Sequence, residues 1–239
     1  MTTKKKAIKI PNHLALIPDG NRRWAADHKL KPWLGHRQGE KNFREILKEV
    51  LNMGVVYFSV WAMSKDNFQK RSPYEVRFLL NLFKKDFQEL INSEDIHKNK
   101  IKINAIGWWR DLFPKEVVEI IQKAMDATKN YQDHFLNFFL AYSGTEDMLR
   151  AIEKTALKIK SGVKISSNLL KENLLSCDLP PVDFLIRTGG DPHLSDGFMM
   201  WDTANTQLYF SDKLWPDFVL EDFKKAMDNY NHRQRRFGK

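Results

Sequence analysis

Short apolar runs that alternate with helical patterns constrain the fold of this chain most strongly. The runs contain β-branched and aromatic residues without alternating polar ones, which is typical of strands covered on both faces. They occupy residues 14–17, 55–60, 101–106, 135–141, 182–186 and 208–210. Between them, apolar residues recur at helical spacing in residues 38–53, 73–92, 114–129, 145–160 and 220–232. This order predicts an α/β fold with a mostly parallel central sheet flanked by helices.

The chain has the size of one domain. It contains 239 residues and shows no internal repeat and no Pro/Gly-rich linker, so we expect a single domain over residues 1–239 with a flexible start at residues 1–11. Cys177 is the only cysteine, which excludes an internal disulfide and favours a reduced, cytoplasmic location. No apolar run approaches the length of a transmembrane helix.

The charge of the chain favours an anionic partner. Thirty-nine Lys and Arg residues against 30 Asp and Glu residues give a net charge of +9. Nucleic acid, membrane headgroups and phosphorylated substrates all fit such a charge. The cations at the strand ends are spread over separate loops and do not form a stripe along one helix. This arrangement favours a compact anionic ligand and argues against nucleic acid.

The loop after the first predicted strand carries the most specific chemistry. In α/β sheets, ligands bind beyond the carboxyl ends of the strands. Here the strand ends at Pro18, and the sequence Asp-Gly-Asn-Arg-Arg-Trp follows at residues 19–24. One carboxylate beside two arginines on a glycine-containing turn is suited to magnesium and pyrophosphate.

Two further strand ends offer ligands for phosphate. A polar, cation-bearing loop is predicted after the second strand, at residues 61–72, and the fifth strand is followed by Arg187 and a Gly-Gly turn whose N–H groups can face an anion. His36 is predicted at the entrance of a helix. Neither a P-loop nor a dinucleotide-binding glycine motif is present, which argues against an ordinary nucleotide fold.

These segments together resemble the cis-prenyltransferases, the undecaprenyl (polyprenyl) diphosphate synthase family. The resemblance extends over nearly the whole chain and is carried by residues 13–24, 35–39, 64–71, 182–190, 208–218 and 235–238. It implies an α/β homodimer with a hydrophobic tunnel that opens at the strand ends. It also implies a Mg²⁺-dependent condensation of isopentenyl diphosphate with an allylic diphosphate such as farnesyl diphosphate, which creates a Z double bond.

The resemblance also assigns roles to individual residues. Asp19 and Asn67 correspond to catalytic positions, Asp19 as a magnesium ligand and Asn67 at the position linked to proton loss. Because an amide is a poor base, we expect Asn67 to orient groups and released pyrophosphate to accept the proton. The C-terminal tail, residues 233–239, is expected to reach the active site. The expected substrate-binding residues are Gly20, Asn21, Arg22, Arg23, Trp24, His36, Ser64, Asp66, Phe68, Lys70, Arg71, Arg187, His193, Ser195, Arg236 and Gly238.

The sequence departs from the family pattern mainly on the isopentenyl side. Gln207 stands where the family has a glutamate that completes the magnesium site, and an uncharged amide should bind the metal more weakly. His193 replaces an arginine. The loop before Ser195 is one residue longer, and so is the second loop, which leaves open whether Lys70 or Arg71 takes the family's arginine role. These changes suggest two hypotheses, ordinary chain elongation after neutral divergence and an irregular joining of two allylic diphosphates.

Other classes of function remain as alternatives. A non-catalytic subunit of a prenyltransferase complex is disfavoured because such partners typically lose the Asp-Gly-Asn-Arg block, which is kept here. A nucleic-acid-binding module would rest on net charge alone. A peripheral contact with a membrane surface is credible for an enzyme with a greasy product. The helix at residues 73–92 is the expected tunnel wall, and Ala62 leaves space beside it.

Overall fold

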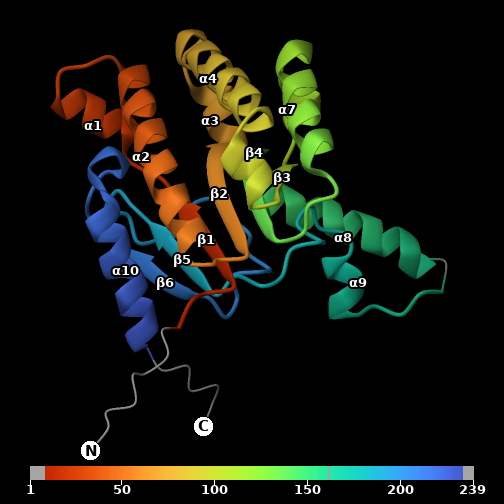
Figure 1. Ribbon diagram of the computed structural model, residues 1–239. Helices are drawn as coiled ribbons and strands as arrows, with labels where there is room; N and C mark the ends of the chain where they lie inside the picture. The colour runs from red at the N-terminus through yellow and green to blue at the C-terminus, as the bar shows by residue number, and fades with distance from the viewer. Residues whose placement is uncertain (1–8, 161, 234–239) are drawn as a thin grey trace, which may run out of the picture.

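A six-stranded, all-parallel sheet lies at the centre of the computed structural model, which describes residues 9–160 and 162–233 (Figure 1). The strand order is β3-β4-β2-β1-β5-β6. The strands are β1 (His13–Ile17), β2 (Tyr57–Ser64), β3 (Ile101–Ile106), β4 (His134–Tyr142), β5 (Phe184–Arg187) and β6 (Gln207–Phe210). The predicted parallel α/β architecture is confirmed.

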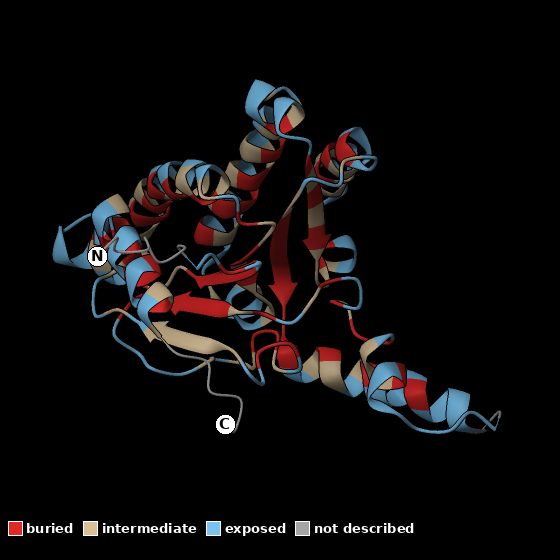
Figure 2. Ribbon diagram, turned by 60° about the horizontal axis from the view of Figure 1, so that its bottom comes forward, coloured by how far each residue is buried: buried red, intermediate tan, exposed pale blue. Residues whose placement is uncertain are grey.

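Alternate residues of the central strands pack into two separate apolar layers. Leu14 and Leu16 of β1 belong to the larger core, whereas Ala15 and Ile17 belong to the smaller one, because neighbouring side chains of a strand point to opposite faces. Figure 2 shows the buried residues concentrated in the strands and on the helix faces turned toward them. The larger core is covered by α2 (Pro32–Asn52), α4 (Pro73–Ile91), α7 (Lys115–Thr128) and α10 (Leu220–His232).

The opposite face of the sheet packs against a less regular part of the chain. Phe198 stacks on Trp61 of β2 with ring centroids 5.1 Å apart, and Leu179 and Met199 join the same apolar layer. Two more helices follow β4: α8 (Gly144–Lys160), whose Asp147 accepts a hydrogen bond from the Tyr142 hydroxyl at the end of β4, and α9 (Ser167–Lys171). The larger core lies under α2 and α4.

The structure contains short helices where the sequence analysis expected loops. The predicted loop after the second strand is wrong, because β2 continues to Ser64 and α3 (Lys65–Lys70) follows at once. The Ser64 side chain accepts a hydrogen bond from the N–H of Asn67 and so caps this helix. The other short elements are α1 (Asn21–Asp27), α5 (Glu94–Lys98), α6 (Trp109–Leu112) and the 3₁₀ turn η1 (Trp215–Asp217).

The start of α2 also differs from the prediction. The helix begins at Pro32, a favoured first residue, so His36 lies inside the helix and not at its entrance. The chain start at residues 1–8 and the tail at residues 234–239 lie outside the described residues. Within the described ranges, no helix is both long and apolar enough to cross a membrane.

Candidate active site

Asp19 lies directly beyond the carboxyl end of β1, in the centre of the sheet. Its backbone oxygen accepts hydrogen bonds from the Thr188 hydroxyl (2.8 Å) and from the Trp215 N–H (2.9 Å). One carboxylate oxygen lies 3.0 Å from Arg187 and the other 3.4 Å from Arg23, and the side chain is 38% exposed. Asp19 is thus held at the backbone, while its carboxylate stays accessible between two guanidinium groups.

The helix α1 follows Asp19 and packs closely on α2. A Cβ on Gly35 would lie 1.9 Å from the backbone oxygen of Asn21, and one on Gly39 would lie 2.1 Å from the side-chain oxygen of the same residue. Only glycine permits this approach. The contact fixes the position from which Arg22 and Arg23, both exposed, extend toward the strand ends.

A buried carboxylate, Glu75 at the start of α4, joins three predicted site residues. Its side-chain oxygens lie 3.0 Å from Nε2 of His36, 3.3 Å from Arg71 and 3.7 Å from Arg22. Burial lowers the pKa of His36, so the ring is neutral near pH 7 and donates its Nε2 hydrogen to Glu75. Burial opposes ionisation of Glu75 as well, but the hydrogen bond from His36 and the charge of Arg71 outweigh it and lower its pKa.

The loop after β5 forms the second part of the site. Gly189 and Gly190 have φ angles of +95° and +80°, so the predicted Gly-Gly turn is formed with the backbone conformation that glycine favours. The buried Arg187 guanidinium donates to the Ser195 hydroxyl and to the His193 carbonyl, each at 2.6 Å. Arg187, His193 and Ser195 are therefore brought together, and Arg187 connects them to Asp19.

The second predicted loop contributes less than the sequence suggested. Arg71 contacts the Glu75 cluster, whereas Lys70 pairs with Asp66 at 2.5 Å and both of these side chains are exposed. The geometry thus favours Arg71 for the arginine role. Phe68 packs on Phe113 with ring centroids 5.4 Å apart. The remaining residues of this segment, Ser64 and Asn67, form the helix cap of α3.

Trp24 does not join the predicted site residues. The Trp24 indole stacks on His28 and donates a hydrogen bond to Asp217. The indole that lines the cavity described below is Trp215. Arg236 and Gly238 lie outside the described residues.

Gln207 does not lie beside Asp19 in the same chain. Gln207 is level with Phe184 of β5, which pairs with Leu14 of β1, whereas Asp19 follows Ile17. Leu14 and Ile17 are three residues of strand apart, which is about 10 Å, and Asp19 lies two residues beyond Ile17. The buried Oε1 of Gln207 has no hydrogen-bond partner among the residues described. The expected metal site made of both residues is therefore not formed within one chain.

The donor set at Asp19 fits a magnesium ion carried by a diphosphate. Among the described residues, no group of three or more His, Cys, Asp or Glu side chains gathers that could hold a metal alone. Mg²⁺ commonly takes one or two carboxylates from a protein and its other ligands from substrate phosphates and water. The accessible carboxylate of Asp19 meets that requirement.

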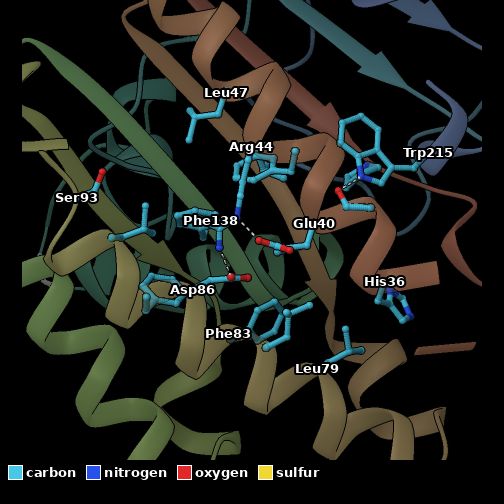
Figure 3. Close-up of a pocket in the computed structure, with 18 of the residues that line it drawn as sticks. His36, Glu40, Arg44, Leu47, Leu79, Phe83, Asp86, Ser93, Phe138 and Trp215 are labelled. Atoms are coloured by element: carbon cyan, nitrogen blue, oxygen red, sulfur yellow. Dashed lines mark hydrogen bonds and ion pairs between the residues drawn. The ribbon is translucent and has the colours of Figure 1, made fainter. Parts of the chain in front are cut away.

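An apolar cavity of about 410 Å³ lies between the sheet and the helices α2 and α4 (Figure 3). Pro18 and Asn21, on either side of Asp19 in the sequence, line it together with His36. Its apolar wall is supplied by Phe43, Leu47, Leu51, Val60, Ala62, Leu79, Leu82, Phe83, Phe87, Leu90, Ile96, Phe138 and Trp215. The predicted contribution of the helix at residues 73–92 and of Ala62 to such a wall is confirmed.

Two features of the site were missed in the sequence. Glu75 precedes Leu79 by one helical turn, so a carboxylate on the apolar face of α4 was a readable signal. Arg44 of α2 and Asp86 of α4 also line the cavity and form an ion pair at 2.7 Å. Their partnership joins residues 42 positions apart and could not be read from helical periodicity.

Comparisons with known proteins agree with this geometry. The family model described as "Putative undecaprenyl diphosphate synthase" matches residues 17–238. The chain is 37% identical to the tritrans,polycis-undecaprenyl-diphosphate synthase (geranylgeranyl-diphosphate specific) of Pyrococcus horikoshii, over 99% of this chain and 90% of that protein. It is also 37% identical to the isoprenyl transferase of Thermus thermophilus, over 96% of this chain and 89% of that protein.

A solved structure shows the same fold. The crystal structure of lavandulyl diphosphate synthase from Lavandula x intermedia, in complex with dimethylallyl diphosphate, superposes with a TM-score of 0.86. It is 31% identical and covers 96% of this chain and 98% of its own. The sequence motifs, the parallel sheet with its apolar cavity and these relatives lead to one conclusion: the chain belongs to the cis-prenyltransferase (undecaprenyl diphosphate synthase) family and is an isoprenyl transferase.

Proposed function

We propose that this protein condenses isopentenyl diphosphate with an allylic diphosphate, such as farnesyl diphosphate, to give a longer Z-prenyl diphosphate in a Mg²⁺-dependent reaction. The observation that carries the proposal is the cavity beside Asp19, because it joins a cationic site for a diphosphate to an apolar space for a prenyl chain. Its volume of about 410 Å³ lies in the range of small-molecule sites.

On the allylic side, Arg22 and Arg23 would bind the diphosphate, with the prenyl chain in the cavity. Asp19 would hold the magnesium ion, which when bound supplies positive charge against the diphosphate oxygens. The bond between the allylic carbon and the diphosphate oxygen breaks, and the guanidinium groups offset the negative charge that develops on the leaving group. The double-bond electrons of isopentenyl diphosphate form the new carbon–carbon bond.

The reaction is completed by loss of a proton from the isopentenyl unit, which forms the new double bond. Released pyrophosphate is the proposed acceptor, and Asn67 orients the reacting groups. The isopentenyl diphosphate itself would be bound by Arg187, Ser195 and His193. Since Arg187 already donates hydrogen bonds within its own loop, some of these bonds are exchanged for bonds to the substrate.

A second candidate is the joining of two allylic diphosphates. It is supported by the altered residues His193 and Gln207 and by the similarity to a lavandulyl diphosphate synthase solved with dimethylallyl diphosphate. A third, a non-catalytic subunit, would require that the Asp19 block has no role in turnover.

Product analysis by mass spectrometry distinguishes these functions. We expect the purified protein with Mg²⁺, isopentenyl diphosphate and farnesyl diphosphate to give Z-elongated products. Product from dimethylallyl diphosphate alone, without elongation, would instead favour the irregular condensation. Absence of every product, together with full activity of an assembled complex after Asp19→Ala, would favour the subunit.

We also propose that the protein forms a homodimer, and that its apolar product brings it into peripheral contact with a membrane surface. The helix α8 exposes several large apolar side chains, which is typical of an interface: Leu149, Ile152 and Ile159. Light scattering of the purified protein tests the dimer, and cosedimentation with anionic vesicles tests the membrane contact. A monomer in the first case, or no cosedimentation in the second, would contradict the respective proposal.

A further inference from the structure

A cluster of charged side chains interrupts the apolar wall of the cavity. Arg44 of α2 donates hydrogen bonds to Glu40 on its own helix and to Asp86 on α4, and it also forms an ion pair with Glu89 at 2.6 Å. Glu40, Arg44 and Asp86 line the cavity. Figure 3 shows the three side chains together, between the His36 end of the cavity and the end marked by Leu47 and Ser93.

The cluster lies near the middle of the cavity. Both His36, close to the diphosphate site, and Leu51, at the far end, line the cavity from α2. Arg44 is eight residues after His36 and seven before Leu51, which correspond to about 12 Å and about 10 Å along a helix. A prenyl chain that starts at the diphosphate site and grows between α2 and α4 must therefore reach the level of Arg44 before it reaches Leu51.

The carboxylates of the cluster that line the cavity are largely shielded from water, since the side chains of Glu40 and Asp86 are 13% and 24% exposed, whereas that of Arg44 is 44% exposed. Three carboxylates surround the single guanidinium group of Arg44. Burial, together with the nearby charge of Glu40, raises the pKa of Asp86 to about 7. A hydrocarbon chain that passes these groups removes their remaining water without offering any hydrogen bond, which is unfavourable for ionised side chains.

We propose that the cluster of Glu40, Arg44 and Asp86 limits the length of the prenyl chain, as a polar barrier midway along the cavity. This inference rests on the proposed function. The compartment before the barrier holds the part of the prenyl chain nearest the diphosphate, and elongation ends when the tail can advance no further past Arg44. The cluster is therefore a determinant of product length, although it touches none of the reacting atoms.

Removal of the charges with little change in shape tests the barrier. The variant Glu40→Gln/Arg44→Met/Asp86→Asn keeps side chains of similar size, and we expect its products to be longer than those of the wild type by at least one isoprene unit. The matched control is Lys84→Met/Glu116→Gln, which removes an exposed ion pair between α4 and α7 (2.7 Å) outside the cavity. Its product length should equal that of the wild type. Unchanged product length in a folded triple variant would overturn the proposal.

A binding series on the wild-type protein gives a second test that needs no variant. Calorimetry with geranyl, farnesyl, geranylgeranyl and geranylfarnesyl diphosphate, without isopentenyl diphosphate, should show affinity that rises with chain length and levels off before the end of the series. A steady rise through the longest ligand would overturn the barrier. A protein that binds none of these ligands and forms no product would instead contradict the proposed function.

Discussion

The arginines of α1 and the arginine of the β5 loop differ in how much of their binding capacity is already used. Arg22 and Arg23 have side chains 58% and 47% exposed, and their nearest carboxylate contacts lie at 3.4–3.7 Å. Arg187 is 3% exposed and donates hydrogen bonds to His193, Ser195 and Asp19. The α1 side is thus open to an anion, whereas the β5 loop must exchange internal bonds for bonds to a ligand.

This difference indicates unequal preorganisation of the two proposed substrate sites. An anion at α1 meets donors that need little rearrangement, so binding free energy is retained there. An anion at the β5 loop first displaces hydrogen bonds that satisfy a buried charge. We therefore expect substitutions at the α1 side to impair catalysis itself, and substitutions in the β5 loop to change the affinity for the second substrate.

The largest expected effect is that of Asp19→Ala. The variant loses the proposed magnesium ligand, which is also the carboxylate shared by Arg23 and Arg187. We therefore expect kcat to fall by at least about 100-fold, as for other electrostatic groups at reacting centres. Steady-state kinetics at saturating Mg²⁺ measures this. Asp27→Ala, at the exposed end of α1, is the control and should retain wild-type kcat. Equal activities of the two variants would show that catalysis at the exposed α1 arginines does not depend on Asp19.

A smaller effect is expected for Glu75→Gln. The substitution leaves Arg71 and Arg22 without their shared counter-charge, and the free energy of unfolding should fall by about 2 kcal/mol. Urea denaturation measures this, with Glu45→Gln on the exposed face of α2 as a control that changes little. The KM for the allylic diphosphate should rise in Glu75→Gln as well. A variant as stable as the wild type would show that the cluster does not depend on this carboxylate.

The β5 loop is tested by His193→Arg. Arginine adds a permanent charge and paired donors that grip a phosphate, so the KM for isopentenyl diphosphate should fall about tenfold while that for the allylic diphosphate stays unchanged. Initial-rate kinetics with each substrate varied in turn measures both constants. The exposed His232→Arg on α10 is the control. A change confined to the KM for the allylic diphosphate would place His193 at the allylic site and contradict the proposed assignment of the loop after β5 to isopentenyl diphosphate.

The smallest expected effect is a pH dependence from His36. Burial lowers its pKa in the folded protein, so below about pH 6.5 the unfolded chain binds more protons and stability falls as pH falls. Between about pH 7 and 5.5 we expect wild type to lose more of its free energy of unfolding than His36→Gln does. Denaturant titrations at both pH values measure this. Parallel losses in the two proteins would mean that His36 remains protonatable in the fold.

The sequence predicted the layers of the fold well because strands buried on both faces leave continuous apolar runs. It failed at α1 and α3, which are short and polar and depend on tertiary contacts, such as that of Asn21 with Gly35. Helical periodicity is weak in segments of this length. The end of β2, residues 61–64, was assigned to a loop although three of its four residues are apolar, because the polar residues that follow directly were read together with them.

The candidate site was predictable where its residues lie at a strand end, as Asp19 does just after β1 and Arg187 does at the last position of β5. It was not predictable where two helices must come together. Glu75 and His36 are 39 residues apart and meet only because α2 and α4 both line the cavity. The separation of Gln207 from Asp19 depends on strand register, which no local motif specifies.

The contact of Asn21 with Gly35 and Gly39 has a consequence for redesign of the protein. Gly35 and Gly39 leave no space between α2 and Asn21, so α1 cannot shift on α2 and the two helices behave as one rigid unit. Substitutions at Phe43 or Leu47 would change the shape of the cavity without displacing Arg22 and Arg23. Even one methyl group at position 35, in contrast, would shift α1 and with it these arginines.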